Sequence, residues 1–540
     1  MERKLIDYTV AEQVECAANT FGNKTAYYFP ASNERLSFID VKQLSDRVSK
    51  AMLALGIGRG SHVGIWNVNC AKYVGLALGA TQIGAVFVPL NVNYTGDELL
   101  DLCHSSDLDS FFVMERFNNK NSSEILRGFF AGEKIDEVKF PKLKSIVTCA
   151  ESSDWQAMGW NEFLAKGLEI SDEALAAAKN AVSNQDVYNI QYTSGTTAKP
   201  KGARLIQHGV LNKAVSYLEF MHIDADDVVY VPLPLFHCYG NVLTMLGTLI
   251  QGNCTIYPPG FSVSQALPVL INEKCTCFMG VASMFNLLMS HPSFSSTELH
   301  IKKAGVGGSF CPLALAEQIQ EKFGIETLTI GYGLSEACAL VTISDIYDPA
   351  VSRLNSVGRP LPGLEVSLFN PATQQISQEL NEGEVVIRGL GVMIDYYNDP
   401  ENTQKAIDEN GWLHTGDLGS FDEYGCLHIV GRIKDIIIRG GENISASEIE
   451  QAVMEVDGVR DCQCVGAPDD LFGEQIAAFI VMQDGLAFNP DEIRAALDGK
   501  IAKYKIPHYM FQIDVMPINA SGKVLKTELR DRVKRILNKE

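Results

Sequence analysis

The feature that most constrains the fold is an alternation of short β-branched runs with helix-length amphipathic segments through the first three hundred or so residues. The clearest helix candidate covers 38–56, where apolar residues recur with helical spacing and the segment ends at a glycine. Such alternation predicts parallel βαβ layers and therefore an α/β fold. The strand candidates lie at 62–68, 85–91, 111–115, 144–150, 227–235 and 254–260.

The pattern changes at about residue 355. Short strand candidates at 364–370, 383–389 and 426–432 are separated by Gly, Asn and Asp turns, which is typical of a small β-barrel or a meander. We therefore expect a large N-terminal domain at 1–431, with two βαβ-type subdomains and a small β-barrel at about 355–430.

The rest of the chain restarts as an α+β unit that begins with 433–456 and closes with 503–537. A chain of 540 residues is too long for one ordinary domain. We place a domain boundary near 431–435 and expect a C-terminal domain at 435–540.

Composition narrows the class of protein. The net charge of −21 argues against a general nucleic-acid binder, because the phosphate backbone attracts basic surfaces. The apolar run 73–91 contains polar residues, glycines and a proline, which indicates a buried helix and a buried strand rather than a membrane span. Thirteen scattered cysteines indicate a reducing compartment, which we take to be the cytoplasm. The CxC pairs at 275–277 and 462–464 are expected to be small core residues.

The stretch QYTSGTTAKPKGARLIQHG, residues 191–209, has the composition of a phosphate-binding loop. The hydroxyls of Ser194, Thr196 and Thr197 can donate hydrogen bonds, and Lys199 and Lys201 supply positive charge. Backbone N–H groups in such a turn form an anion-binding concavity, to which a helix that begins just after it adds its positive end.

Two common nucleotide-binding folds are disfavoured. A P-loop needs a lysine after its last glycine and then a hydroxyl, whereas Lys201 precedes Gly202 and Ala203 follows it. The stretch SGKV at 521–524 places a valine where that hydroxyl should be. A Rossmann GxGxxG after an early strand is also missing from the sequence.

The loop YTSGTTAKPKG resembles the signature loop of the adenylate-forming superfamily, which includes acyl-CoA ligases, luciferase-type enzymes and peptide-synthetase adenylation domains. Four further motifs follow in the order of that family: GYGLSEA (331–337), GWLHTGDLG (411–419), GRIKDIIIRGGENISASEIE (431–450) and INASGKVLK (518–526). Three intervening stretches are similar to the medium-chain fatty-acyl-CoA ligases: FMGVASMFNLLMSHPSF (278–294), AGVGGSFCPLAL (304–315) and VMIDYYNDPENTQKAI (392–407).

The resemblance implies an ATP-dependent carboxylic acid–CoA ligase that forms an acyl-AMP and then an acyl-CoA, with ATP, Mg²⁺ and coenzyme A as cofactors. It gives catalytic roles to Lys523, which would bridge the substrate carboxylate and the α-phosphate, to His237 near that carboxylate, and to Glu336 as a metal ligand with Thr196. The ATP- and AMP-binding residues that it implies are Thr193, Ser194, Gly195, Thr196, Thr197, Lys199, Lys201, Gly308, Gly331, Tyr332, Gly333, Ser335, Glu336, Asp417, Arg432 and Lys523.

Within this set, the resemblance places Tyr332 against adenine, Ser335 at the α-phosphate, and Asp417 with Arg432 at the ribose hydroxyls. It also implies a hinge at 432–434, with Lys434 as the residue about which a mobile C-terminal domain rotates between the two steps. The implied CoA-binding residues are Arg439, Gly440 and Gly441. The implied acyl pocket contains His237, Cys238, Tyr239, Ser283, Met284, Gly307 and Ala337.

The segments that supply the acyl pocket contain no lysine or arginine, which favours an apolar acid, such as a medium-chain fatty acid, over a dicarboxylate. Aryl, cyclic, steroid and carnitine-type acids stay open, as does a stand-alone adenylation enzyme that loads a carrier protein. A non-catalytic nucleotide-binding protein is disfavoured because Lys523 is present. We expect no nucleic-acid partner and no stable membrane insertion, and leave open peripheral membrane association and a homodimer. Ala198 stands where most relatives carry glycine, and we expect it to leave ATP binding intact.

Overall fold

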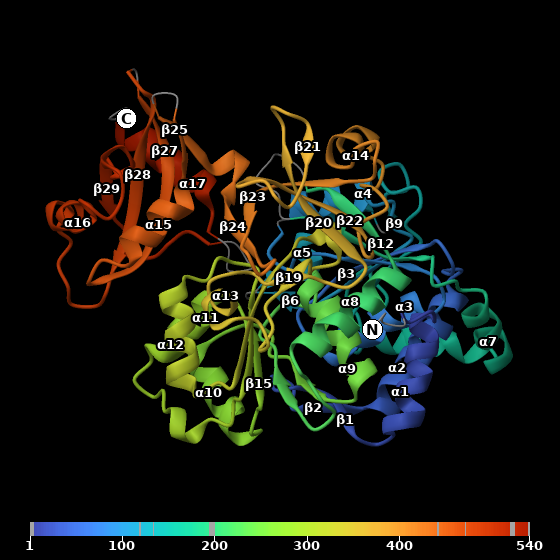
Figure 1. The fold of residues 1–540 in the computed structure, drawn as a ribbon. Helices are drawn as coiled ribbons and strands as arrows, with labels where there is room; N and C mark the ends of the chain where they lie inside the picture. Colours follow the sequence, from blue (N-terminus) through green and yellow to red (C-terminus); the bar gives the residue numbers. More distant parts are fainter. Residues whose placement is uncertain are drawn as a thin grey trace.

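Two mixed sheets form the body of the molecule (Figure 1). A computed structural model of the protein describes residues 5–94, 96–117, 120–132, 134–193, 200–439, 442–469, 471–518 and 524–537. The larger sheet has the order β19-β18-β17-β16-β15-β13-β14-β1-β2, and its neighbours from β17 to β1 are all parallel. Its strands are β1 (Thr25–Phe29), β2 (Glu34–Ser37), β13 (Val228–Tyr230), β14 (Cys254–Ile256), β15 (Cys277–Gly280), β16 (Lys303–Gly307), β17 (Thr327–Tyr332), β18 (Thr342–Ile343) and β19 (Arg359–Pro360).

The second sheet has the order β10-β5-β3-β4-β11-β12, parallel except for the last pair. Its strands are β3 (His62–Trp66), β4 (Val86–Pro89), β5 (Ser110–Val113), β10 (Ser145–Thr148), β11 (Val187–Tyr192) and β12 (Gly202–Ile206). Each strand candidate of the first three hundred residues overlaps one of these observed strands, and all but 111–115 contain it in full. The predicted parallel α/β architecture is confirmed.

Helices pack on both sheets because alternate residues of a strand face opposite sides. Tyr27 and Phe29 of β1 belong to a core that also contains residues of β3, β4 and β11, whereas Tyr28 belongs to a second core on the other face. The shared core includes the apolar faces of α1 (Val10–Phe21), α2 (Phe38–Ala54), α3 (Ala71–Thr81) and α8 (Gln207–Phe220). The outer core of the larger sheet includes α10 (Val263–Asn272), α11 (Ala282–Met289) and α12 (Leu313–Phe323).

Local sequence explains where α2 begins. The Ser37 hydroxyl accepts from the backbone N–H of Asp40, and the Asp40 carboxylate accepts from the backbone N–H of Ser37. This reciprocal cap starts α2 at Phe38, which is where the predicted helix begins. The apolar run 73–91 forms most of α3 and all of β4, again as predicted. Within the described ranges, no helix has the length and apolarity needed to cross a membrane.

The region at about 355–430 differs from the expected barrel. It forms an antiparallel sheet in the order β21-β20-β22-β23-β24, and no pairing of its two edge strands closes it within the described residues. The strands are β20 (Leu364–Asn370), β21 (Gln375–Ile376), β22 (Gly383–Gly389), β23 (Leu413–Phe421) and β24 (Leu427–Arg432). The open meander leaves β24 as an edge strand, from which the chain continues into its last segment.

The last segment forms a sheet of its own, coloured orange to red beside β23 and β24 in Figure 1. Its order is β26-β25-β28-β27, with β29 also paired to β28. The elements are β25 (Ile436–Arg439), β26 (Glu442–Ser445), α15 (Ala446–Met454), β27 (Val459–Asp469), β28 (Gly473–Met482), α16 (Pro490–Leu497), β29 (Tyr509–Gln512) and α17 (Lys526–Leu537). Two cores drawn from residues 437–537 cover its faces, with α15 and α16 on one side and α17 on the other. Cys462 and Cys464 are buried in the first of them, as expected.

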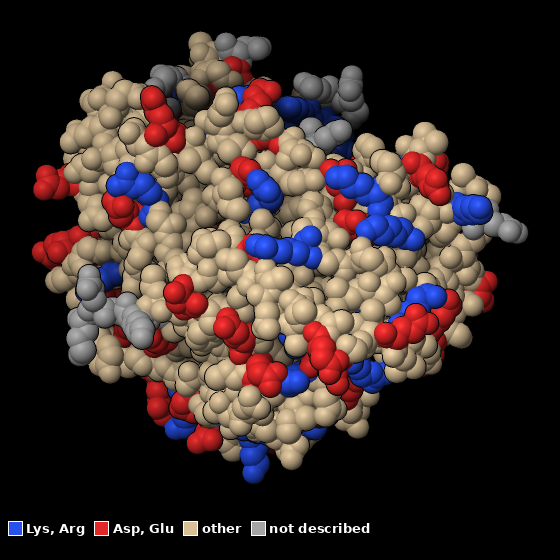
Figure 2. All heavy atoms as spheres, turned by 90° about the vertical axis from the view of Figure 1, so that its right-hand side faces the viewer, with Lys and Arg blue, Asp and Glu red and all other residues tan. Residues whose placement is uncertain are grey.

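One face of the molecule shows how its charged side chains are distributed. Acidic and basic side chains lie intermixed on the face shown in Figure 2, without a broad patch of one sign. Ion pairs such as Lys50–Asp172 at 2.7 Å and Arg59–Asp186 at 2.6 Å join separate elements. Because exposed pairs contribute about 0–1 kcal/mol each, the fold depends mainly on its apolar cores.

Candidate active site

The ends of the proposed phosphate loop are held as a β-hairpin. β11 and β12 pair antiparallel with Tyr192 opposite Gly202, and the N–H of Thr193 donates to the carbonyl of Lys201 at 2.9 Å. The expectation that a helix follows the loop directly is wrong, because strand β12 intervenes and α8 begins only at Gln207. The remaining loop residues of the prediction, Ser194, Gly195, Thr196, Thr197, Ala198 and Lys199, lie outside the described residues.

Beyond this hairpin, Lys201 and Glu336 are joined by a tyrosine. The Lys201 Nζ atom lies 4.7 Å from the centroid of the Tyr396 ring, and the Tyr396 hydroxyl donates to Glu336 Oε1 at 2.7 Å. Burial, and then the nearby Glu336 charge, raise the pKa of Tyr396, so the phenol stays protonated and donates. Sequence reasoning gave Tyr396 no role, although it lies in the stretch 392–407 that carries part of the resemblance.

The predicted adenine and ribose residues form a hydrogen-bonded group. Asp417 is 3% exposed, and its two carboxylate oxygens contact the Tyr332 hydroxyl and the Arg432 Nε atom, each at 2.7 Å. Asp417 and Arg432 are also directly paired in the ladder between β23 and β24. Burial and the Asp417 charge raise the pKa of Tyr332 well above its usual value. The group therefore presents a fixed carboxylate beside an aromatic ring.

The carboxyl ends of three parallel strands meet at this place. Gly307 at the end of β16 lies opposite Gly331 of β17, and Gly280 at the end of β15 lies opposite Val306. This edge is where α/β sheets bind ligands. The predicted site residues that lie at these strand ends or just after them are Gly308, Ser283, Met284, Tyr332, Gly333, Ser335 and Ala337.

Two glycines here are required by geometry. A Cβ on Gly333 would lie 1.8 Å from the carbonyl oxygen of Ala339, so only glycine fits the turn. Gly308 has φ +77°, a left-handed conformation that favours glycine. At both positions, glycine allows the backbone to lie close to the carboxyl ends of the parallel strands.

The predicted acyl residues contact this edge from the segment after β13. Cys238 Sγ lies 3.9 Å from Ser335 Oγ, and the Tyr239 ring lies against Gly307, where a Cβ would be 3.3 Å from it. Tyr239 begins a π-helical segment, η3 (Tyr239–Leu246). The structure therefore brings Cys238 next to Ser335 and Tyr239 next to Gly307, while the roles of these residues in acyl and nucleotide binding stay predictions.

His237 has the properties of a buried neutral imidazole. Burial lowers its pKa to about 4, so it carries no charge at pH 7. Its Nε2 atom is buried and has no hydrogen-bond partner among the described residues. A buried polar atom of this kind is usually satisfied by a ligand or a water.

The C-terminal candidates are held by side-chain pairs. Arg439 donates from Nε to Gln475 Oε1 at 2.6 Å and lies over the Phe472 ring at 4.7 Å. The carbonyl of Lys434 accepts from Arg530 at 3.3 Å. Gly440, Gly441 and Lys523 lie outside the described residues.

Two ion pairs hold the residues that follow Lys523 in the sequence. Arg530 of α17 contacts Asp435 at 2.6 Å, and Lys526 contacts Glu450 at 2.7 Å. Burial alone would raise the pKa of Asp435, but Lys526 and Arg530 outweigh it and lower that pKa. A bridge between Ile518 and Val524 closes the base of the loop.

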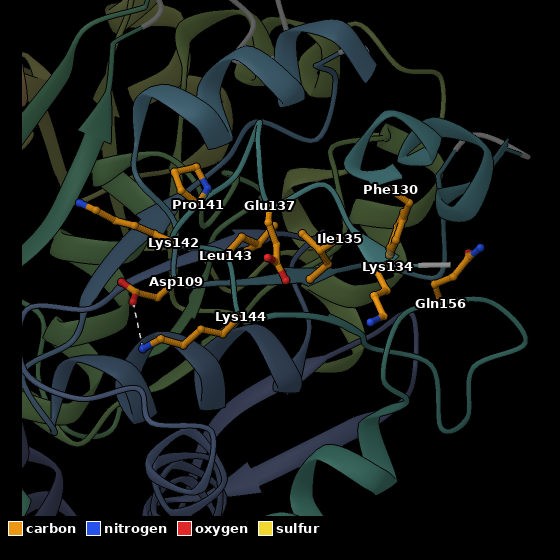
Figure 3. Close-up of a pocket in the computed structure, with 10 residues that line it drawn as sticks. All are labelled: Asp109, Phe130, Lys134, Ile135, Glu137, Pro141, Lys142, Leu143, Lys144 and Gln156. Carbon is orange, nitrogen blue, oxygen red and sulfur yellow. Dashed lines mark ion pairs between the residues drawn. The ribbon is translucent and has the colours of Figure 1, made fainter. Parts of the chain in front are cut away.

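One pocket of about 700 Å³ lies away from every predicted site residue (Figure 3). Two of its three lysines are paired, since Lys144 contacts Asp109 at 3.2 Å and Lys142 contacts Asp107 at 3.2 Å. A second hollow of about 360 Å³ adjoins Tyr396 and is lined by Arg204, Asp395, Tyr396, Tyr397, Asn398, Asp399, Pro400, Thr403 and Gln404.

Within the described residues, no group of three or more His, Cys, Asp or Glu side chains could hold a metal ion. Glu336 therefore offers a single carboxylate.

Comparisons with known proteins cover nearly the whole chain. The family model described as AMP-binding enzyme matches residues 14–397, and that described as AMP-binding enzyme C-terminal domain matches residues 448–523. The chain is 35% identical to YngI of Bacillus subtilis (strain 168), covering 99% of both. It is 30% identical to the mitochondrial medium-chain acyl-CoA ligase ACSF2 of Rattus norvegicus, covering 99% of this chain and 89% of the relative. ATP-bound MatB from Rhodopseudomonas palustris matches with a TM-score of 0.82 at 25% identity, covering 98% of this chain and 100% of that one.

Proposed function

Because this chain belongs to the AMP-binding enzyme family, we propose that it activates an apolar, medium-chain carboxylic acid for transfer to coenzyme A. The chain is an AMP-forming acyl-CoA ligase that uses ATP, Mg²⁺ and CoA. In the first step a carboxylate oxygen attacks the α-phosphorus of ATP, and the bond to pyrophosphate breaks. In the second step the CoA thiol attacks the acyl carbon and AMP leaves.

The observation that carries the proposal is the contact between the acyl-side and nucleotide-side segments. Cys238 and Ser335 lie 3.9 Å apart, so an acid held by His237–Tyr239 would have its carboxylate beside the nucleotide. Such proximity converts an encounter of two substrates into reaction within one complex. The segments that supply the proposed acyl pocket contain no lysine or arginine, which favours an acid without a second charge.

The described residues fit Mg²⁺ and nucleotide chemistry. Glu336 offers the hard carboxylate oxygen that Mg²⁺ prefers, and we propose it as a metal ligand with Thr196. When bound, Mg²⁺ would neutralise charge on the phosphate oxygens. We propose Tyr332 for adenine, Asp417 and Arg432 for the ribose, Ser335 for the α-phosphate, and the loop 193–202 for the outer phosphates.

Two residues are proposed to act at the reacting carboxylate. Neutral His237 can hydrogen-bond an oxygen through its Nε2 atom, which has no partner among the described residues, without adding charge. Lys523 would stabilise the charge that accumulates on the α-phosphoryl group.

We further propose that residues 1–431 and 435–540 are separate domains joined at 432–434. The two cores drawn from residues 437–537 support this division. Rotation about Lys434 would exchange Lys523 for the CoA-contacting residues Arg439, Gly440 and Gly441 between the two steps. Thirteen cysteines, all free in the structure, support a reducing cytoplasmic location.

A panel of carboxylic acids, assayed for CoA-dependent AMP formation, tests the substrate. We expect medium-chain fatty acids to give the highest kcat/KM, above aryl, cyclic, steroid and carnitine-type acids. A preference for one of those classes would replace the medium-chain assignment. Product formed only with a phosphopantetheinylated carrier protein, and not with free CoA, would instead indicate the carrier-loading function.

A further inference from the structure

The segment 393–397 holds Glu336 from two directions. The N–H of Met393 donates to the backbone carbonyl of Glu336 at 2.7 Å, and the Tyr396 hydroxyl donates to its carboxylate Oε1 at 2.7 Å. Tyr396 is 5% exposed, so this hydrogen bond is largely shielded from water. Together the two bonds fix both the backbone and one carboxylate oxygen of Glu336.

The same tyrosine contacts the end of the phosphate loop. The Lys201 ammonium lies over its ring at 4.7 Å, within the range of a cation–π interaction. Lys201 also closes the hairpin by accepting from the N–H of Thr193. One side chain therefore contacts groups from two motifs that are more than one hundred residues apart in the sequence.

The backbone that carries Tyr396 is held firmly against β12. The N–H of Tyr397 donates to the carbonyl of Gly202 at 2.8 Å, and Tyr396 pairs with Ala203 in a β-bridge. Arg204 and Asp395 form a bidentate ion pair, with N–O distances of 2.7 and 2.5 Å. These contacts fix the backbone of Tyr396 against β12, the strand that follows the phosphate loop.

We propose that Tyr396 is a positioning residue for the adenylation step, which holds Glu336 and Lys201 in the relative arrangement that binds MgATP. The proposal rests on the proposed function, because it takes Glu336 as the metal ligand and Lys201 as a phosphate-binding residue. A hydrogen bond to one oxygen of a carboxylate restrains its rotation, and the other oxygen would then be available to hold Mg²⁺. The aromatic face limits where the lysine ammonium can lie.

The test compares two neighbouring variants. Tyr396→Phe removes one hydroxyl and keeps the ring over which Lys201 lies. Tyr397→Phe is the matched control, because it removes the adjacent tyrosine's hydroxyl, which contacts Asp107 at 2.8 Å. The readouts are ATP–pyrophosphate exchange against Mg²⁺ concentration and, without turnover, ATP affinity by calorimetry with and without Mg²⁺.

For Tyr396→Phe we expect the Mg²⁺ concentration at half-maximal exchange to rise about 10-fold, as losses of a metal ligand's hydrogen-bond partner do. Affinity for ATP should fall in the presence of Mg²⁺ and stay unchanged without it, and Tyr397→Phe should match the wild type. Reaction of supplied acyl-AMP with CoA should be retained in both variants.

A double-mutant cycle with Glu336→Gln decides whether Tyr396 acts through Glu336. If it does, Tyr396→Phe should have little further effect on MgATP affinity in the Glu336→Gln background. Unchanged Mg²⁺ dependence in Tyr396→Phe, or an equal loss at every Mg²⁺ concentration with a lower unfolding temperature, would overturn the proposal. Absence of exchange in the wild type with every acid of the panel would instead reject the proposed function.

Discussion

The candidate site residues before Arg432 and those after it are held in place by different kinds of contact. In the first region, Tyr332 and Asp417 sit on strands whose register fixes them, and their contact is partly buried. In the second region, the residues that follow Lys523 are held by the ion pairs Lys526–Glu450 and Arg530–Asp435. A change of sheet register would turn every side chain of a strand to the other face, whereas an ion pair depends on the conformation of two side chains. The comparison therefore contrasts proposed nucleotide-binding residues held by strand register with proposed catalytic residues held by side-chain pairs.

The largest effect that would sharpen this comparison is expected at Lys523. Lys523→Ala should reduce adenylation by about 10²–10³-fold, because in the proposed mechanism it removes the charge that stabilises the α-phosphoryl group. It should spare the reaction of supplied acyl-AMP with CoA. Both half-reactions would be followed separately, with Lys503→Ala, another lysine change in the same region, as the control.

A smaller effect, but on both half-reactions, is expected at Asp417. Asp417→Asn weakens the charge-assisted bond to Arg432 and the proposed bond to ribose, and losing such a bond costs about 1.5–3 kcal/mol, or roughly 10–150-fold in binding. Glu365→Gln is the control, since Glu365 lies on the same sheet in an exposed pair with Arg388. A loss confined to one half-reaction would contradict the view that this region forms a fixed nucleotide site.

The buried Lys213 gives the first region a predicted dependence of stability on pH. Lys213 of α8 is 1% exposed, and its Nζ atom donates to the carbonyl of Leu340 at 2.5 Å. That carbonyl follows Cys338 and Ala339, which have φ of 55° and 75°, unusual for residues other than glycine. Burial lowers the pKa of Lys213 to about 7, while the neighbouring Cys338 acts in the opposite direction.

The pH dependence follows from the direction of that shift. Between pH 7 and the ordinary lysine pKa the unfolded chain binds a proton that the folded chain does not, so stability rises with pH in this window. The contribution is up to about 1.4 kcal/mol per pH unit. The Lys213→Met variant should lack this rise of stability with pH. The measurement is the free energy of unfolding by denaturant at pH 7, 8 and 9. Lys302→Met, at an exposed lysine, should behave as the wild type, and a parallel slope in Lys213→Met would contradict the buried, neutral amine.

The smallest effect is expected at Ala198. Ala198→Gly should change the KM for ATP only a few-fold, because alanine costs roughly 1 kcal/mol even where φ is positive. Steady-state kinetics at saturating acid and CoA would measure it. A large gain in the glycine variant would show that the phosphate loop is impaired by its alanine.

Much of the first region could be predicted from the sequence, since local patterns determine it. The strands at 364–370 and 383–389 have the predicted bounds, and the reciprocal cap at Ser37 marks the start of α2. The open sheet in place of a barrel could not be predicted, because closure depends on the pairing of edge strands rather than on any one strand. The strand after the phosphate loop was missed because GARLI leads directly into a helix-like run.

The roles of Tyr396 and Lys213 could not be predicted for a related reason. Tyr396 meets Glu336 across sixty residues of sequence, and Lys213 meets Leu340 across 127. Neither residue belongs to a spacing pattern that indicates its partner. Both contacts arise only when helices and loops close over the ends of the parallel strands.

The pairing of Asp417 with Arg432 has a consequence for communication within the molecule. Arg432 is the last residue of β24, and Lys434 lies two residues later in the short turn Ile433–Asp435. A ribose bound by Asp417 would therefore restrain the strand end to which the proposed pivot is attached. Nucleotide occupancy and the orientation of residues 435–540 would then be thermodynamically linked through a single peptide segment, without a relay across the core.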